Sequence, residues 1–311
     1  MNFPSGHPLC VDLEPSDGMQ SKPHYLSSDI LLVIDYDLPY AHPRNKPDPG
    51  TKIIHIDLDF VKQGGLLWNR RADISIKADS GKAIPALADL VRNRITADQR
   101  KGIHERCQKI RDENLKVRND NDALGKDDGD KKPISPEWLA YCINLAIDED
   151  TIVINQTIMP SGSVARQIPR DKPGTLIACA GGTIGWALGA GLGAKVAAPD
   201  KLVVSLMGDG AFVYGGPTAT LWPAVNYKAP FLSVIFNNQA YGAIKMLFEM
   251  SGKEGVKDSL ILPSPDYAAT AQACGAYGRK VEDPQDVLPA LKEAVSQVRS
   301  GKAAVLDVRL G

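Results

Sequence analysis

The chain has 311 residues, 43% of them apolar and 23% charged, and this composition is typical of a globular protein with a sizeable core and about two domains. Thirty-six basic and 37 acidic side chains leave a net charge of −1, so we expect neither nucleic acid nor a membrane among the partners. Five scattered cysteines without a C-x-x-C pair argue against a disulfide framework and a structural zinc site, and favour a cytoplasmic protein.

The first part of the chain alternates between predicted strands and a predicted helix. Short apolar runs over residues 30–34 and 52–56 are typical of parallel strands that are covered on both faces. A proline-rich loop lies between them, and apolar residues at helical spacing predict a helix over residues 81–94. We therefore expect residues 1–95 to form part of an α/β domain.

The next segment, residues 96–133, is dominated by charge. Ten basic and nine acidic side chains lie between residues 96 and 132, with few apolar ones. This pattern predicts a charged, solvated helix followed by a linker, and we assign it no binding role.

The remaining residues, 134–311, alternate regularly between predicted strands and helices. Ser135 is a predicted N-cap for a helix that ends at Ala146. Because strands and helices follow one another in this way, we expect an α/β fold with a doubly wound parallel sheet. The predicted strands are residues 151–154, 202–207, 231–236 and 303–308.

Two short polar motifs follow neighbouring predicted strands. Gly208-Asp209-Gly210 comes after the strand that ends at residue 207, and Asn237-Asn238 comes after the one that ends at residue 236. The carboxyl ends of parallel strands meet at the sheet edge where ligands bind. Glycines let the backbone approach a phosphate, and Asp and Asn oxygens suit Mg²⁺. Each motif alone is also a common turn, but together they predict a Mg²⁺-diphosphate site.

This joint pattern resembles the cofactor motif of the thiamine diphosphate (ThDP) enzyme superfamily, which consists of Gly-Asp-Gly, a spacer of this length and Asn-Asn. The resemblance covers residues 135–311 as the diphosphate-binding domain and, less strongly, residues 1–95 as the later part of a central domain. It implies ThDP and Mg²⁺ as cofactors. The metal ligands implied are the carboxylate of Asp209, the side-chain amide of Asn238 and the backbone carbonyl of Ala240, while Asn237 orders the turn.

The same resemblance implies further contacts with the cofactor. Ile184 matches a large aliphatic residue that bends ThDP, and the carbonyl of Gly182 matches the acceptor for its amino group, so that base and carbon acid are held together. Close packing of a glycine-rich helix on the sheet is the alternative explanation of this stretch. The other residues expected at the cofactor are Gly208, Gly210, Ala211, Thr183, Thr157 and Ile158.

A histidine in the proline-rich loop has two interpretations. His42 matches an active-site histidine of benzoylformate-decarboxylase-like relatives by its distance from the strand over residues 30–34. The alternative is an ordinary histidine on a surface loop.

The resemblance implies a 2-oxoacid decarboxylase or an acetohydroxyacid synthase-like carboligase that acts through a C2 ylide of the cofactor. Enzymes of this superfamily have three α/β domains, and this sequence resembles them from within the second. We therefore expect the pyrimidine-binding domain to come from another chain, in a homo-oligomer or from a partner chain. The alternative is a non-catalytic ThDP-binding protein or a truncated remnant.

Overall fold

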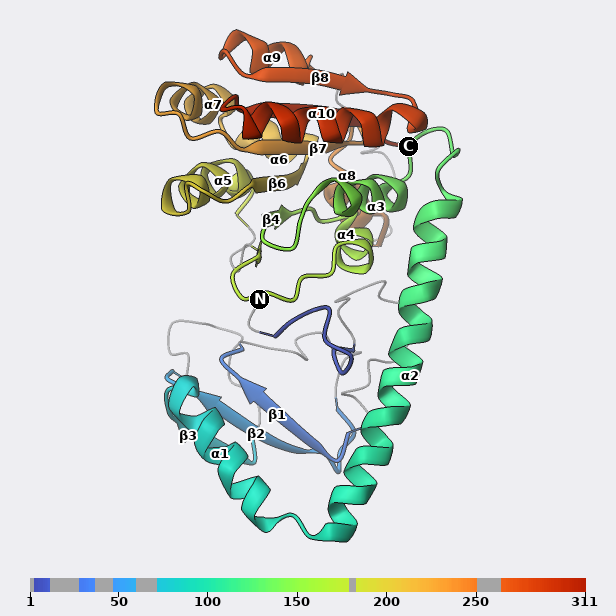
Figure 1. Ribbon diagram of the computed structural model, residues 1–311, viewed down its shortest axis with the longest axis vertical. Coiled ribbons are helices and arrows are strands. Elements are labelled where there is room, and N and C mark those ends of the chain that lie inside the picture. The colour runs from blue at the N-terminus through green and yellow to red at the C-terminus, as the bar shows by residue number, and fades with distance from the viewer. Residues whose placement is uncertain (1–2, 12–27, 37–46, 60–71, 179–182, 251–263) are drawn as a thin grey trace. The chain divides into compact units, whose positions relative to one another are not determined.

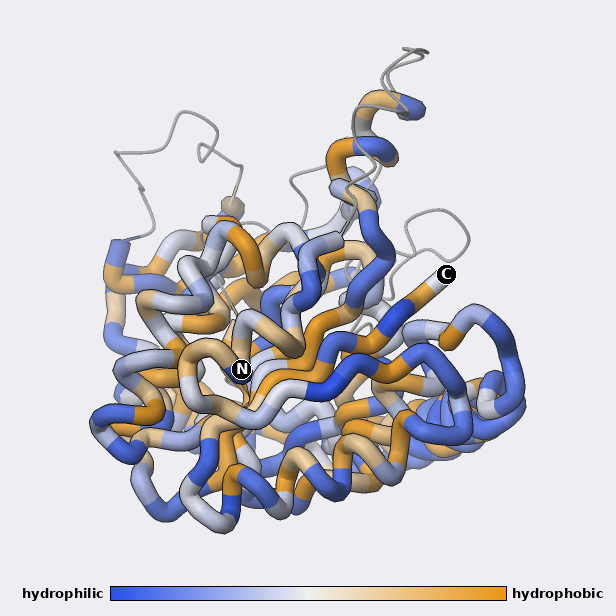
Figure 2. Tube along the Cα trace, turned by 90° about the horizontal axis from the view of Figure 1, so that it is seen from above, coloured by the Kyte–Doolittle hydropathy of each residue, from blue (hydrophilic) through white to orange (hydrophobic). Residues whose placement is uncertain are grey.

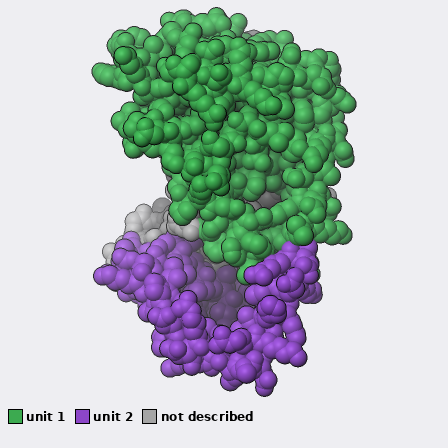
Figure 3. Space-filling model, viewed as in Figure 1, with its two compact units in different colours: residues 1–14, 113–311 green, residues 15–112 purple. Residues whose placement is uncertain are grey.

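The computed structural model describes residues 3–11, 28–36, 47–59, 72–178, 183–250 and 264–311. The chain divides into two compact units, one formed by residues 1–14 with 113–311 and the other by residues 15–112 (Figure 3). Each unit is described below by itself.

Among its described residues, the smaller unit contains three parallel strands, the helix α1 and the first part of the long helix α2 (Ala97–Asp127). The strands are adjacent in the order β1-β2-β3, and Leu32 of β1 lies opposite Ile54 of β2. The helix begins after Asp79, whose side chain accepts a hydrogen bond from the amide of Gly81 over 2.8 Å. The elements are β1 (Ile30–Ile34), β2 (Lys52–Asp57), β3 (Ile74–Lys77) and α1 (Ser80–Arg94).

The charged segment forms one long helix, α2 (Ala97–Asp127), labelled in Figure 1. The helix continues through Gly125, which is its one buried residue. A Cβ atom on Gly125 would lie 3.0 Å from the side chain of Tyr141, so the absence of a side chain lets the end of α2 approach α3 (Pro136–Ala146) closely. The end of this charged segment is therefore part of the larger unit and packs against α3 there.

The larger unit contains a six-stranded sheet in which every strand pair is parallel. The strand order is β5-β4-β6-β7-β9-β8, so the chain winds outwards in both directions from its middle. This order confirms the predicted doubly wound α/β fold. The strands are β4 (Ile152–Gln156), β5 (Leu176–Ala178), β6 (Val203–Gly208), β7 (Leu232–Asn237), β8 (Tyr277–Val281) and β9 (Ala304–Arg309).

Helices cover both faces of this sheet, and hydrophobic and hydrophilic residues alternate along them (Figure 2). Ser135 caps α3, because its Oγ accepts from the amide of Trp138 over 3.0 Å, as the sequence predicted. The other helices are α4 (Ser161–Gln167), α5 (Trp186–Ala197), α6 (Asp209–Tyr214), α7 (Pro217–Asn226), α8 (Gly242–Met250), α9 (Tyr267–Ala273) and α10 (Val287–Arg299), with a 3₁₀ turn at Pro284–Asp286.

The core lies in two clusters, one on each face of the larger sheet. Leu206 of β6 packs in one cluster with α3 and α10, and its neighbour Met207 packs in the other with α5 and α7. Successive side chains of a strand point to opposite faces, so the continuous apolar run of β6 serves both layers. This apolar run ends at Gly208, the first residue of the Gly208-Asp209-Gly210 motif.

Candidate functional site

The carboxyl ends of four adjacent strands coincide at one edge of the larger sheet. Gly208 at the end of β6 lies opposite Phe236 of β7, and Gln156 at the end of β4 lies opposite Met207. On the other side, Asn237 at the end of β7 lies opposite Arg309 of β9. The register therefore brings the residues that follow β4, β6 and β7 to one place, as the spacing of the motifs predicted.

Asp209 is the buried acid of this edge, with an exposed fraction of 2%. Its Oδ1 atom accepts from the amide of Gly210 over 2.9 Å, whereas its Oδ2 atom is buried without a hydrogen-bond partner among the described residues. Burial raises the pKa of the Asp209 carboxyl, and the amides of Gly210 and Gln239 and the charge of Arg309 oppose that shift. An oxygen that is buried and unsatisfied is a position that a cation can stabilise.

The turn after β7 is built by its own side chains. Asn237 is 1% exposed, and its Oδ1 accepts from the amide of Gln239 over 3.1 Å. The Oδ1 atom of Asn238 likewise accepts from the amide of Ala240 over 3.1 Å. Gln239 has a φ of 53°, in the left-handed region. These bonds give Asn237 the turn-ordering geometry that the sequence analysis expected. They leave Asn238 and Ala240 half-buried on either side of Gln239, whose backbone amide acts on the carboxyl of Asp209.

Gly210, which follows Asp209, allows close packing at this edge. A Cβ atom on Gly210 would lie 3.0 Å from the ring of Tyr241, so a side chain there would crowd the turn after β7. Gly208 is half-buried and has open space where a Cβ would be, and Ala211 is 8% exposed. The ring of Tyr241 also lies 6.5 Å from that of Tyr214, edge to face.

The residues after β4 lie at the same edge but differ in exposure. Thr157 is buried, and its hydroxyl donates to Asn155 Oδ1 over 2.7 Å. Ile158 has an exposed fraction of 62%. Of this pair, therefore, Thr157 is held by hydrogen bonds and Ile158 presents an apolar side chain to the exterior.

Gln156 connects the end of β4 to the start of α5. Its Oε1 accepts from the amide of Ala187 over 2.8 Å, and its Nε2 donates to the carbonyl of Thr183. Ile184 follows directly and is 46% exposed. Gln156 thus brings Thr183 and Ile184 to the edge that holds Asp209, although the sequence analysis did not select it.

The glycine-rich stretch that leads into α5 and continues along it is only partly explained by close packing on the sheet. A Cβ atom on Gly191 would lie 2.2 Å from Ser205 Oγ, so this glycine lets α5 lie close to β6. Gly185 has a φ of 86°, and a Cβ there would lie 2.5 Å from the backbone of Gly215. Nothing lies within 4 Å of the Cβ positions of Gly189 and Gly193. Gly182 and His42, which the sequence analysis also selected, lie outside the described residues.

Three further residues escaped the sequence analysis. Asp307 and Arg309 come from β9 and contact the turn after β7, and Ser264 donates from its Oγ to Asn237 Oδ1 over 3.1 Å. The one signal in the sequence was a charged residue, Asp307, inside the otherwise apolar run of residues 303–308, which is buried.

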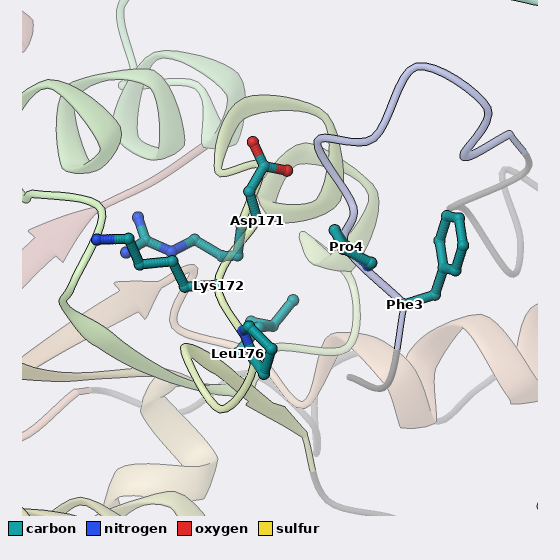
Figure 4. A pocket seen from close by; sticks show the side chains of 7 residues that line it. Phe3, Pro4, Asp171, Lys172 and Leu176 are labelled. Carbon is teal, nitrogen blue, oxygen red and sulfur yellow. The ribbon is translucent and has the colours of Figure 1, made fainter. Parts of the chain in front are cut away.

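A small pocket elsewhere in the larger unit has a structural explanation. It has an empty volume of about 240 Å³ and lies beside the amino ends of β4 and β5 (Figure 4), whereas Asp209 lies at the carboxyl edge. Arg170 donates there to the carbonyls of Asp148 and Thr151 over 2.6 and 2.9 Å, and Lys172 pairs with Glu149 and Asp150. Its cationic side chains thus already have partners.

The described residues contain neither a cluster of metal-ligating side chains nor a membrane-spanning helix. No group of three or more His, Cys, Asp or Glu side chains is arranged to hold a metal there, so a zinc-type cluster is not found in this part of the chain. Among the same residues, none of the helices combines the length and apolar character that crossing a membrane requires.

Comparison with known proteins identifies relatives along most of the chain. Residues 160–308 match the family described as thiamine pyrophosphate enzyme, C-terminal TPP binding domain. The chain is 27% identical over 263 residues to the acetolactate synthase isozyme 3 large subunit of Escherichia coli, covering 84% of this chain and 44% of that protein. It is 28% identical over 179 residues to a benzoylformate decarboxylase of Pseudomonas aeruginosa, covering 57% of this chain and 32% of that protein.

A solved structure shares the fold. The thiamine diphosphate-dependent 4-hydroxybenzoylformate decarboxylase of Rhodococcus jostii RHA1 superposes with a TM-score of 0.74 at 23% identity, over 99% of this chain and 54% of that one. The chain spans about half the length of that protein and of the synthase subunit.

Proposed function

Because the chain belongs to the thiamine diphosphate-dependent enzyme superfamily, we propose that it binds ThDP with Mg²⁺ at the carboxyl edge of its larger sheet. The buried, unpartnered Oδ2 atom of Asp209 is the observation that carries this proposal. Mg²⁺ prefers oxygen ligands and commonly takes only one or two from side chains, the remainder being phosphate oxygens and water. A single buried carboxylate at a strand end therefore suits a metal that is shared with a diphosphate.

Mg²⁺ fits the donor atoms that surround Asp209. The carboxylate of Asp209, the amide oxygen of Asn238 and the backbone carbonyl of Ala240 are all oxygen donors. Asn238 Oδ1 accepts one hydrogen bond from the amide of Ala240, and a carbonyl oxygen has a second lone pair for a metal. We propose these three residues as the metal ligands of the chain.

The remaining residues of the edge would bind and orient the cofactor. We propose that the backbone of Gly208, Gly210 and Ala211 faces the diphosphate, and that Thr157, Ile158 and Thr183 line its other side. The amide of Gly210 already donates to Asp209. Gly210 would therefore contribute space for the diphosphate, because it has no side chain, and not a hydrogen bond. Ile184, which is 46% exposed, would press on the cofactor between its two rings.

The reaction that we propose is carbon–carbon bond cleavage or formation next to the carbonyl of a 2-oxoacid. ThDP, when bound, supplies the stabilisation of the carbanion that this chemistry needs. Two relatives support this class, one an acetolactate synthase large subunit and the other a benzoylformate decarboxylase, since benzoylformate is itself a 2-oxoacid. Asp209 and its neighbours would hold the diphosphate, and Gly182 and His42 stay predictions.

We also propose that the site is completed by another polypeptide, either a second copy of this chain or a partner chain. Several large apolar side chains are exposed at or beside the same edge, and covering them would exclude water from the site. The synthase relative is itself a large subunit. These exposed residues are Ile158, Met159, Ile184, Val213 and Tyr214.

Calorimetric titration of the chain with ThDP tests the proposed function. The account predicts saturable binding when Mg²⁺ is present and a large loss of affinity when the metal is chelated, because the negative charges of the diphosphate and of Asp209 would then lack a cation between them. Binding that is equally tight with and without Mg²⁺ would contradict the metal site. Release of CO₂ from pyruvate and from benzoylformate tests the reaction class when the loaded chain is combined with the polypeptide that completes its site. The loaded chain alone should release negligible CO₂.

A further inference from the structure

The end of β9 holds the turn that follows β7 through three separate contacts. Asp307 Oδ1 accepts from the side-chain amide of Asn237 over 2.7 Å. The backbone amide of Leu310 donates to the carbonyl of Asn237 over 2.8 Å. The guanidinium of Arg309 donates to Gln239 Oε1. The turn is therefore fixed from the neighbouring strand as well as by its own side chains.

The contact between Asp307 and Asn237 is fully buried. Both residues have an exposed fraction of 1%. Removal of its acceptor would leave the buried side-chain amide of Asn237 unsatisfied, and water cannot replace the acceptor at this depth. Asp307 therefore fixes one end of the Asn237 side chain.

The other end of the same side chain fixes the turn. Asn237 Oδ1 accepts from the amide of Gln239 and from Ser264 Oγ, each over 3.1 Å. Gln239 has a φ of 53°, which is unfavourable for a residue with a side chain unless its surroundings hold it. Rotation of Asn237 would release that amide, and the turn would lose the bond that supports its left-handed residue.

We infer that Asp307 is a positioning residue for the metal site. By fixing Asn237 it holds the turn in the conformation that places Asn238 and the carbonyl of Ala240 beside Asp209. Asp307 itself touches neither metal nor cofactor in this account. The inference rests on the proposed function, because the turn matters for binding only if Asn238 and Ala240 are ligands.

Hydrogen exchange of the cofactor-free chain tests the positioning contact by itself. Asp307→Ala removes the acceptor, and Asp307→Asn keeps an acceptor oxygen without the charge. We expect Asp307→Ala to speed exchange of the Gln239 and Leu310 amides by about tenfold or more, because the buried side-chain amide of Asn237 loses its acceptor. The internal reference is the amide of Tyr277 in β8, which donates to the carbonyl of Ala303 just before β9.

Titration of Mg²⁺-ThDP into the same variants tests what the contact is for. We expect the affinity of Asp307→Ala to fall by about tenfold or more, and that of Asp307→Asn to stay within about threefold of the parent, because the acceptor is restored. Val305→Ala is the matched control, since Val305 is fully buried on the same strand but lies opposite Ser233, near the start of β7 and away from the turn. That variant should lose stability and keep its affinity.

The outcomes separate this inference from the proposed function. Unchanged exchange at Gln239 and Leu310 in Asp307→Ala would overturn the inference, whatever the protein binds. Faster exchange with unchanged affinity would also overturn it, as would equal defects in Asp307→Asn and Asp307→Ala. A parent chain that binds ThDP without regard to Mg²⁺ would instead contradict the proposed function, and with it the metal-positioning part of the inference.

Discussion

Gln156 Oε1 accepts a hydrogen bond from the backbone amide of Ala187 over 2.8 Å, so the last residue of β4 holds the first turn of α5. Ala187 is fully buried, and the first amides of a helix have no partner within the helix itself. A side chain at the end of one strand therefore satisfies a buried donor of the neighbouring helix.

Gln156→Ala should consequently lower the free energy of unfolding by about 1–3 kcal/mol, because it leaves the Ala187 amide buried and unpaired. Denaturant unfolding followed by circular dichroism measures this difference. Gln272→Ala is the control, since its Nε2 donates to the carbonyl of Gly278 from an exposed position, and we expect a change within about 0.5 kcal/mol. Equal losses of unfolding free energy in the two variants would show that the hydrogen bond between Gln156 and the Ala187 amide adds no particular stability.

Alanine substitutions at two glycines of α5 should change the free energy of unfolding in opposite directions. Gly191→Ala places a Cβ 2.2 Å from Ser205 Oγ and 2.9 Å from the ring of Phe231, and overpacking of this kind costs about 1–3 kcal/mol. Gly193→Ala meets nothing within 4 Å and should gain about 0.5–1 kcal/mol of helix propensity. Thermal unfolding of the two variants decides the point, and a Gly191→Ala variant as stable as the parent would refute the close packing of α5 on β6.

Cys142 should make the stability of the chain depend on alkaline pH. Burial raises the pKa of this thiol from 9.0 to about 12. Because the folded pKa lies above the unfolded value, the stabilising contribution is complete below pH 9 and is lost as the pH rises towards 12, with a slope of up to about 1.4 kcal/mol per pH unit.

Urea unfolding at pH 8, 9 and 10 of the parent and of Cys142→Ala measures that contribution, because all other titrating groups are common to both chains. The parent should lose about 1 kcal/mol more than the variant between pH 9 and pH 10. Parallel pH dependences of the two proteins would mean that the thiol titrates in the folded chain as it does in the unfolded one.

Ile184→Ala should separate cofactor binding from cofactor activation. The side chain is 46% exposed, so its truncation should change the free energy of unfolding by less than about 1 kcal/mol. We expect the variant to bind Mg²⁺-ThDP with little change and to exchange the C2 proton of the cofactor more slowly, as NMR of the loaded protein can measure. Exchange at the parental rate would remove the proposed bending role.

The sequence predicted the fold class and the meeting of the two motifs for the same reason. Strand-to-helix alternation is a local pattern, and parallel strands place their carboxyl ends together, so Asp209 and Asn238 could be brought to one edge without coordinates. The contacts of Asp307 and Arg309 could not be predicted from the sequence, because they join residues 70 positions apart and depend on β9 lying beside β7. Gln156 was missed similarly, since a glutamine at a strand end is equally common as a solvated residue.

The central claim is that Asp209 holds the metal through which the cofactor binds, and calorimetric titration of Mg²⁺-ThDP into Asp209→Asn tests it most directly. The amide replacement keeps the shape of the buried side chain, so circular dichroism should confirm an intact fold, and Asp200→Ala on the exterior is the control for a lost negative charge. The account predicts that Asp209→Asn loses Mg²⁺-dependent binding while Asp200→Ala retains it. Binding of ThDP by Asp209→Asn as tightly as by the parent, with Mg²⁺ present, would contradict the account.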